Sequence, residues 1–419
     1  MTTTVHGREA REGRPDTATR LAAFWRYWGA STASGIGDAV TAVALPLLAV
    51  LVLHASAFEV SLITAAGFAS WLLIGLPAGV LVHRLPLRGT QVAMDVVRAV
   101  AVASVPAAAA LGVLSLGQLV VVALVVGLAS VVFDVGNSTF LPSIVSKEEL
   151  TARNSLTSGT RAATQLGGPS LGGVLVQLLG AAASIAVDAV SYVVSAALMG
   201  SLPRVPHPAQ EGPRRGVGEM IREGWRYVVR HPVIGPCTAD ATAVNFVCGG
   251  LMALIPVFLV RTLDAPPALV GVLLATEGLG TLVGAALTPR IVARLGSGRA
   301  LRRAALAAPC FAALIPLAGH SAALALFAVG NGGFCGAVVV TSIVARTYRQ
   351  TATPPELLPR VMATVRFISW GAIPFGALAA GGAAALWGTR ASLALMAALS
   401  TISPAILLAG PVRRMRDLV

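Results

Sequence analysis

The chain has 419 residues, of which 56% are hydrophobic and only 12% are charged, and its mean hydropathy is +0.79. A soluble globular chain carries about twice that charged fraction, so the composition excludes an ordinary soluble domain. The net charge of +13 would suit a nucleic-acid-binding protein, so the distribution of the basic residues has to decide between that class and a membrane protein.

Apolar runs of about 20 residues recur along the whole chain, and this is the length that a helix needs to cross a bilayer. The runs are continuous and rich in Ala, Leu and Val, without the alternation of a barrel strand. We therefore expect an all-α integral membrane protein with twelve transmembrane helices. The expected spans are 27–53, 58–82, 90–112, 117–141, 155–179, 181–202, 237–261, 267–289, 300–318, 321–345, 361–385 and 388–411.

The basic residues gather on one side of this arrangement. When the N-terminus is placed inside, 27 of the 31 Lys and Arg residues fall in inner segments or at the inner ends of spans. Only Arg261 and Arg390 fall in outer loops, and only Arg98 and Arg366 lie deeper within spans. The positive-inside rule then places both termini in the cytoplasm. The positive charge is a topology signal, and we expect no nucleic-acid partner.

A long polar stretch divides the twelve spans into six and six. Its second part is amphipathic, with Trp225, Val228 and Val229 on one face and Arg222, Arg226 and Arg230 around the other. Such a helix lies on the cytoplasmic membrane surface or packs on protein, and both interpretations stay open. The expected units are a cytoplasmic tail (1–24), a six-helix bundle (25–202), a cytoplasmic linker (203–236), a second six-helix bundle (237–411) and a cytoplasmic tail (412–419).

Short motifs repeat between the two halves. Glu149 and Arg153 follow the fourth span with the same spacing as Glu356 and Arg360 after the tenth. We interpret this as a duplicated six-helix unit. Two parallel six-helix repeats around a midplane cavity are typical of major facilitator transporters.

Several segments resemble that superfamily. The loop "GVLVHRLPLRG" (79–89) resembles its loop between helices two and three, and "FDVGNSTFLPSIVSKEELTARNSL" (133–156) and "LLPRVMATVRFISWGAIPFGAL" (357–378) resemble its macrolide-efflux and enterobactin-exporter-like branch. The resemblance extends from Trp25 to Arg416. It implies a proton-driven exporter of the bacterial inner membrane, and it does not specify the cargo.

The loop between helices two and three departs from the usual motif at one position. Arg84 and Arg88 keep its basic part, but His83 stands where an acidic residue is usual. In the superfamily this loop latches the cytoplasmic gate through charge pairs. The resemblance therefore implies a gating role for the two arginines, while His83 makes the pairing pH-sensitive or is purely structural.

Residues 164–173 resemble the helix-five signature of drug:proton antiporters. Gly168, Pro169, Gly172 and Gly173 match it, and Thr164 occupies the position of its first glycine. Glycines one turn apart let a neighbouring helix approach closely, and a proline removes a backbone hydrogen bond and permits a kink. We expect a hinge or seal between the halves; ordinary small-residue packing is the alternative.

Ionisable groups within the expected spans are costly and need a reason. Asp38 and Glu277 lie near the middle of the first and eighth spans, where each could carry a proton or face the cargo. A structural hydrogen bond to a neighbouring helix is the competing interpretation. Asp188 and Asp240 are weaker candidates for a second proton site.

A second group of charges has a different expected role, in gating. These residues are placed near the cytoplasmic ends of the third, fourth, fifth and eleventh spans, and we expect them to form a salt-bridge network that stabilises one gate state. They are Asp95, Arg98, Asp134, Arg161 and Arg366.

Enzyme signatures are missing from the sequence: no histidine pair has metal-ligand spacing, and no phosphate loop is present. We expect no catalytic residues, metal or cofactor, and the proton gradient as energy source. The leading hypothesis is a monomeric, multi-pass exporter in a bacterial inner membrane that exchanges protons for an amphiphilic small molecule, such as an antibiotic, secondary metabolite or siderophore. An importer or lipid flippase of the same fold is the alternative, and a polytopic membrane enzyme is a remote one.

Overall fold

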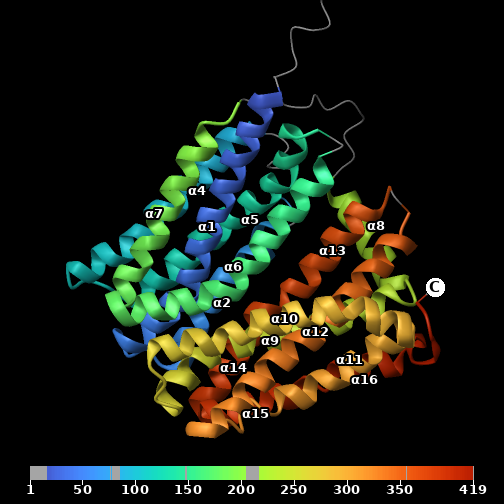
Figure 1. The fold of residues 1–419 in the computed structure, drawn as a ribbon. Coiled ribbons are helices and arrows are strands. Elements are labelled where there is room, and N and C mark those ends of the chain that lie inside the picture. Colours follow the sequence, from blue (N-terminus) through green and yellow to red (C-terminus); the bar gives the residue numbers. More distant parts are fainter. Residues whose placement is uncertain are drawn as a thin grey trace, which may run out of the picture.

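The computed structural model describes residues 17–75, 77, 85–146, 149–203, 217–354 and 356–418. Every element within these ranges is a helix, so the predicted all-α class is confirmed (Figure 1). The helices before the linker are α1 (Thr17–Leu51), α2 (Ala57–Ile74), α4 (Leu87–Ala110), α5 (Leu116–Ile144), α6 (Leu150–Leu179) and α7 (Ala181–Gly200).

The second part of the chain contains more and shorter helices. Here α9 runs directly into a π-helical turn. Two of the expected spans are each divided into two consecutive helices, α13 followed by α14 and α15 followed by α16. The elements are α8 (Val217–Arg230), α9 (Ile234–Val257), η1 (Phe258–Thr262), α10 (Pro267–Leu295), α11 (Ser297–Ala312), η2 (Ser321–Ala323), α12 (Leu324–Ala352), α13 (Leu358–Trp370), α14 (Ala372–Trp387), α15 (Thr389–Leu399), α16 (Ile402–Ala409) and η3 (Pro411–Arg414).

Local sequence sets several of the helix ends. Ser56 and Glu59 form a capping box at the start of α2, in which the Glu59 carboxylate accepts the Ser56 N–H at 2.7 Å. Gly180, Gly296 and Gly388 each end one helix and begin the next, with φ near +84°. This left-handed conformation favours glycine, and it allows a reversal between antiparallel helices within one residue.

Ten helical stretches among the described residues are long and apolar enough to cross a membrane. They do not include α6 and α11, which correspond to the expected spans 155–179 and 300–318. A polar stripe on α6 lowers its hydropathy, and α11 has only 16 residues with a basic start. The count of twelve spans and the cytoplasmic termini remain predictions.

Helices from each half of the sequence pack mainly with one another. In the first half α1 packs on α6 and α7, and α4 packs on α5 and α7; in the second, α9 packs on α14, and α12 packs on α10 and α11. The blue-to-green helices accordingly lie on one side of Figure 1 and the yellow-to-red helices on the other. The two sets meet where α6 contacts α10 and where α2 contacts α14. The bounds of the five units remain predictions.

The linker helix α8 packs on protein through one face. Val228 is 1% exposed, and Gly224 lies so close to α13 that a Cβ there would be 2.6 Å from the Thr364 hydroxyl. Glu223 forms an ion pair with Arg360 of α13. The interpretation that α8 packs on protein therefore holds for this face. Most of the linker before α8 lies outside the described residues.

Candidate functional site

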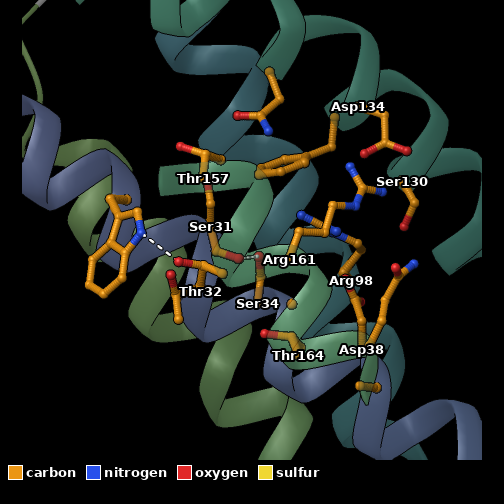
Figure 2. A pocket seen from close by; sticks show the side chains of 17 residues that line it. Ser31, Thr32, Ser34, Asp38, Arg98, Ser130, Asp134, Thr157, Arg161 and Thr164 are labelled. Carbon is orange, nitrogen blue, oxygen red and sulfur yellow. Dashed lines mark hydrogen bonds between the residues drawn. The ribbon is translucent and has the colours of Figure 1, made fainter. Parts of the chain in front are cut away.

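A polar cavity of about 350 Å³ lies between α1, α4, α5 and α6 (Figure 2). Hydroxyl groups dominate its wall, and four of the residues that the sequence singled out for their charge are among those lining it. The lining residues are Trp28, Ser31, Thr32, Ser34, Gly35, Asp38, Ala39, Arg98, Ser130, Phe133, Asp134, Asn137, Thr157, Thr160, Arg161, Thr164 and Gln165.

The carboxylate of Asp38 is exposed to this cavity and is held by the opposite helix. The hydroxyl of Tyr192 on α7, a residue with no exposed surface, donates a hydrogen bond to Asp38 Oδ1. Asp188 lies one turn before Tyr192, is fully buried, and accepts from the Ser191 hydroxyl at 3.1 Å. A Cβ at Gly37 would come within 2.2 Å of Asp188 Oδ1, so this glycine lets α1 lie directly against the buried carboxyl.

Asp95 and Arg98 form a buried ion pair on α4, with 0% and 2% of their side chains exposed. The Ser195 hydroxyl donates to Asp95 Oδ2 at 2.7 Å. The Arg98 guanidinium lies 4.1 Å from the centre of the Phe133 ring and 4.4 Å from that of Tyr192. Such stacking compensates part of the cost of burying the cation.

Tyr192 thus joins two sets of residues to which the sequence gave separate roles. Its hydroxyl binds Asp38, the expected proton carrier, and its ring stacks on Arg98, an expected gate residue. The placement of Arg98 near a helix end was wrong, because Arg98 lies in the middle of α4 and lines the cavity. The placement of Asp95 stays a prediction. The sequence offered one signal for Tyr192: it stands at i+4 from Asp188, on the same helix face.

The wider salt-bridge network is not observed among the described residues. No ion pair within 4.0 Å joins Asp134, Arg161 or Arg366 to one another or to another described residue. Asp134 and Arg161 instead line the cavity, from α5 and α6 (Figure 2).

Within the described part of the chain, Arg366 contacts two aromatic rings rather than a carboxylate. Its guanidinium lies 3.8 Å from the ring centre of Trp71 and 4.4 Å from that of Trp370, and the two indoles meet edge to face at 4.9 Å. Trp71 belongs to α2 and the other two residues to α13. This cluster therefore bridges the two halves, and the sequence gave no sign of it.

The loop residues of the expected latch are only partly described. His83 and Arg84 lie outside the described residues. Arg88 lies in the first turn of α4, half-buried, and no described carboxylate lies within 4.0 Å of it. The gating role of the two arginines stays a prediction.

Glu277 and Asp240 have contrasting surroundings. Glu277 lies on the same side of α10 as the buried residues Val270 and Leu273, and its own side chain is exposed. It does not line the cavity around Asp38. Asp240 on α9 is 3% exposed and accepts a 2.5 Å hydrogen bond from Ser403 of α16, which is the geometry of a structural contact.

The glycines of the helix-five motif pack against two different helices, α1 and α10. A Cβ at Gly168 would lie 2.3 Å from the Ala39 side chain, and one at Gly172 would lie 3.2 Å from Val40 Cα, so both face α1. A Cβ at Gly173 would instead meet Gly271 Cα of α10 at 2.8 Å. Pro169 lies within the continuous helix α6. The motif therefore packs α6 between its own half and the other.

Comparison with known proteins agrees with this architecture. Residues 17–418 match the sequence profile of a family described as transmembrane secretion effector. The chain belongs to this family of major facilitator transporters. It is a multi-pass protein of the bacterial inner membrane, and the proteins it matches are transporters rather than enzymes.

Two relatives illustrate the range of similarity. The multidrug efflux pump Tap of Mycolicibacterium fortuitum is 28% identical over 369 residues, which cover 84% of this transporter and 87% of Tap. An uncharacterized MFS-type transporter of Sinorhizobium fredii is 27% identical over 277 residues, covering 64% of this transporter and 67% of the relative.

Solved structures share the fold at low identity. The nucleoside transporter NupG (D323A mutant) superposes with a TM-score of 0.81 at 10% identity, covering 92% of this transporter and 99% of NupG. A bacterial homologue of the iron transporter ferroportin in an inward-facing state superposes with a TM-score of 0.72 at 16% identity, covering 94% and 99% of the two chains. These likenesses concern the fold alone.

Proposed function

We propose that the protein is a proton-coupled exporter that moves an amphiphilic small molecule out of the cell by alternating access. The observation that carries this proposal is the setting of Asp38, a carboxylate exposed to a polar cavity and held from behind by the buried Tyr192 hydroxyl. An ionisable group within a membrane span is costly, so its presence there supports a functional role. The similarity to a multidrug efflux pump supports export as the direction.

The contacts between the halves fit an inward-facing state. Gly173 lies near the end of α6 and Gly271 near the start of α10, and the charge distribution predicts that both ends are extracellular. The cavity begins at Trp28, close to the predicted cytoplasmic end of α1, and reaches Ala39. Closing this side and separating α6 from α10 would expose the same residues to the outside.

Exchange requires that proton and cargo compete. When Asp38 is protonated the cavity loses a negative charge, and when cargo occupies the cavity the carboxylate loses its water. Tyr192 contacts Asp38 with its hydroxyl and Arg98 with its ring, so it links proton or cargo binding at Asp38 to the buried Asp95–Arg98 pair. Glu277, on the facing half, is the second candidate carrier.

The cavity wall suits a cargo with both polar and apolar parts. Serine and threonine hydroxyls together with Asp134 and Arg161 offer donors, acceptors and both signs of charge, while the Trp28 and Phe133 rings supply apolar surface. An importer or lipid flippase of the same fold remains the alternative, and the direction of cargo movement separates these functions from export.

The test measures proton movement in inverted membrane vesicles, energised to an acid interior, as candidate cargoes are added. We expect cargo to release protons from the vesicles while it accumulates inside, because the vesicle interior corresponds to the cell exterior. Asp38→Asn, which keeps an acceptor for the Tyr192 hydroxyl, is expected to abolish the coupled flux, and Glu277→Gln to reduce it. Cargo-driven flux that is unchanged in both variants would refute the assignment, and cargo movement in the opposite direction would favour import.

A further inference from the structure

The exposed side of the linker helix α8 carries two parallel stripes. Arg222, Arg226 and Arg230 follow one another at four-residue spacing, which places them along one line of the helix, and all three are exposed. Beside them lie Trp225 and Val229, with 49% and 58% of their surface exposed. Apolar and cationic side chains therefore form adjacent stripes on a surface that no described element covers.

The three arginines of this face have no acidic partner. Within the described part of the chain, no carboxylate lies within 4.0 Å of any of them. Of the two acidic residues of α8, Glu223 is paired with Arg360 of α13, and Glu219, one turn before Arg222, forms no ion pair within 4.0 Å with a described residue. The three arginines outnumber the one unpaired carboxylate on this side of the helix, so the stripe keeps a net positive charge.

A hollow of about 420 Å³ adjoins the basic stripe. Arg226, Arg230 and His231 line it together with Tyr227, Pro232 and Leu357, and the paired Glu223 completes the wall. His231 Nδ1 accepts the backbone N–H groups of residues 233 and 234, both at 3.2 Å. Its other ring nitrogen is therefore the one that carries a proton and can donate. The hollow thus offers cationic and neutral donors to an anion.

The position of α8 in the fold determines what can reach this face. The opposite side of the helix is fixed to α13 and α9 by Gly224 and Val228, and α9 begins four residues after α8 ends. Charge distribution predicts that this end of the bundle is cytoplasmic. The two stripes would then lie at the boundary between the acyl chains and the headgroups of the inner leaflet.

We propose that this face of α8 is a binding site for an anionic phospholipid of the cytoplasmic leaflet. An acyl chain lies along Trp225 and Val229, and the phosphate is held by Arg222 and Arg226, with the polar headgroup directed toward the hollow. Arginine suits this role because its planar guanidinium donates two hydrogen bonds to one phosphate. Adjacent apolar and basic stripes are the pattern of helices that bind the membrane surface. A soluble anion would bind the arginines and leave the apolar side chains of Trp225 and Val229 exposed, whereas an acyl chain would cover them.

The experiment uses the full-length protein in detergent, with phosphatidylglycerol and phosphatidylcholine of identical acyl chains titrated separately and bound lipid counted by native mass spectrometry. We expect at least one phosphatidylglycerol to be retained in preference to phosphatidylcholine. The Arg222→Gln/Arg226→Gln variant is expected to weaken that retention on the order of tenfold. Trp225→Ser keeps every charge and is expected to weaken retention of both lipids.

The matched control is Arg413→Gln/Arg414→Gln, which removes the same charge from two exposed arginines at the C-terminal end of the chain. Equal losses in the two double variants would overturn the site, because they would show a general response to charge. Phosphatidylglycerol retained at wild-type affinity by Arg222→Gln/Arg226→Gln would overturn it too, as would displacement of the lipid by millimolar inorganic phosphate, which would show a free-anion site. Each variant is first checked for a wild-type melting temperature, and if the arginine variant fails this check, Trp225→Ser decides the outcome.

Discussion

At the scale of single residues, Tyr192 links two parts of the candidate site. It contacts a carboxylate exposed to the cavity with its hydroxyl and a buried guanidinium with its ring. The sequence indicated Asp38, Asp95, Arg98 and Asp188 separately because charges in apolar runs are conspicuous. An uncharged tyrosine in an apolar run is not, so only the packing of α7 on α1 and α4 revealed its role.

The buried Asp95–Arg98 pair makes a clear stability prediction. Removing one partner leaves an uncompensated charge without water, so Asp95→Asn or Arg98→Gln alone should destabilise the protein by about 3–5 kcal/mol. The double variant should recover part of that loss because neither charge then remains. Thermal unfolding in detergent measures both effects. A double variant as unstable as the sum of the single ones would contradict a direct pair.

His231 gives the fold a predicted dependence on pH. Burial lowers the pKa of His231 below its usual value of 6.5, so the folded protein holds this imidazole neutral. The unfolded chain binds the proton more readily, so the contribution to stability is present above pH 6.5 and is lost as the pH falls below it. His231→Asn keeps an acceptor for the first N–H groups of α9. We expect the melting temperature of wild type to fall more than that of the variant between pH 7.5 and 5.5; equal falls would contradict this.

At the scale of helices, α6 has different neighbours on its different faces. Its hydroxyl-bearing face lines the cavity, two of its glycines contact α1, and Gly173 contacts α10 of the other half. The sequence predicted the close approach from the small residues and their spacing. It could not say which helix would approach, because the glycine pattern is the same for any partner.

The glycines of α6 allow a matched comparison. A Cβ at Gly173 would lie 2.5 Å from the Pro267 carbonyl oxygen, so Gly173→Ala should force α6 and α10 apart and cost about 1–3 kcal/mol. Gly167 in the same helix faces open space, so Gly167→Ala should leave stability unchanged or raise it by up to about 1 kcal/mol.

If the α6–α10 contact closes the outer side, Gly173→Ala should also let a membrane-impermeant reagent reach the cavity from outside, whereas Gly167→Ala should not. Labelling of a cavity cysteine in intact cells measures this. Equal labelling in both variants would show that the contact is not a seal.

At the scale of the whole molecule, the contacts between the halves support the proposal that the cavity opens to the cytoplasm. Thr160 and Arg161 line it from α6, and Asp38 lines it from α1. The broad features followed from composition: the all-α class, the membrane location and the weighting of basic residues to one side. The expected salt-bridge network is not seen among the described residues, where Arg366 lies on the Trp71 ring across the halves and forms no ion pair within 4.0 Å.

Labelling with a thiol reagent tests the direction of opening. Thr160→Cys is introduced after the four native cysteines, Cys237, Cys248, Cys310 and Cys335, have been replaced by Ser or Ala. We expect rapid labelling by an impermeant maleimide in inverted vesicles and slow labelling in intact cells, because the halves meet on the predicted outer side. Faster labelling in intact cells would mean that the topology or the open side has been assigned wrongly.

The sequence by itself determined that this protein is embedded in a membrane and that its elements are helices. These follow from the length and polarity of each segment, because a bilayer tolerates little else than a helix whose backbone groups are all hydrogen-bonded. Tertiary structure decided which charges meet. Tyr192 contacts both Asp38 and Arg98, and Arg366 lies on Trp71. These contacts depend on how each helix is rotated and on which helices pack together. A periodic apolar sequence leaves those rotations undetermined, since lipid and a neighbouring helix offer an apolar face nearly the same environment.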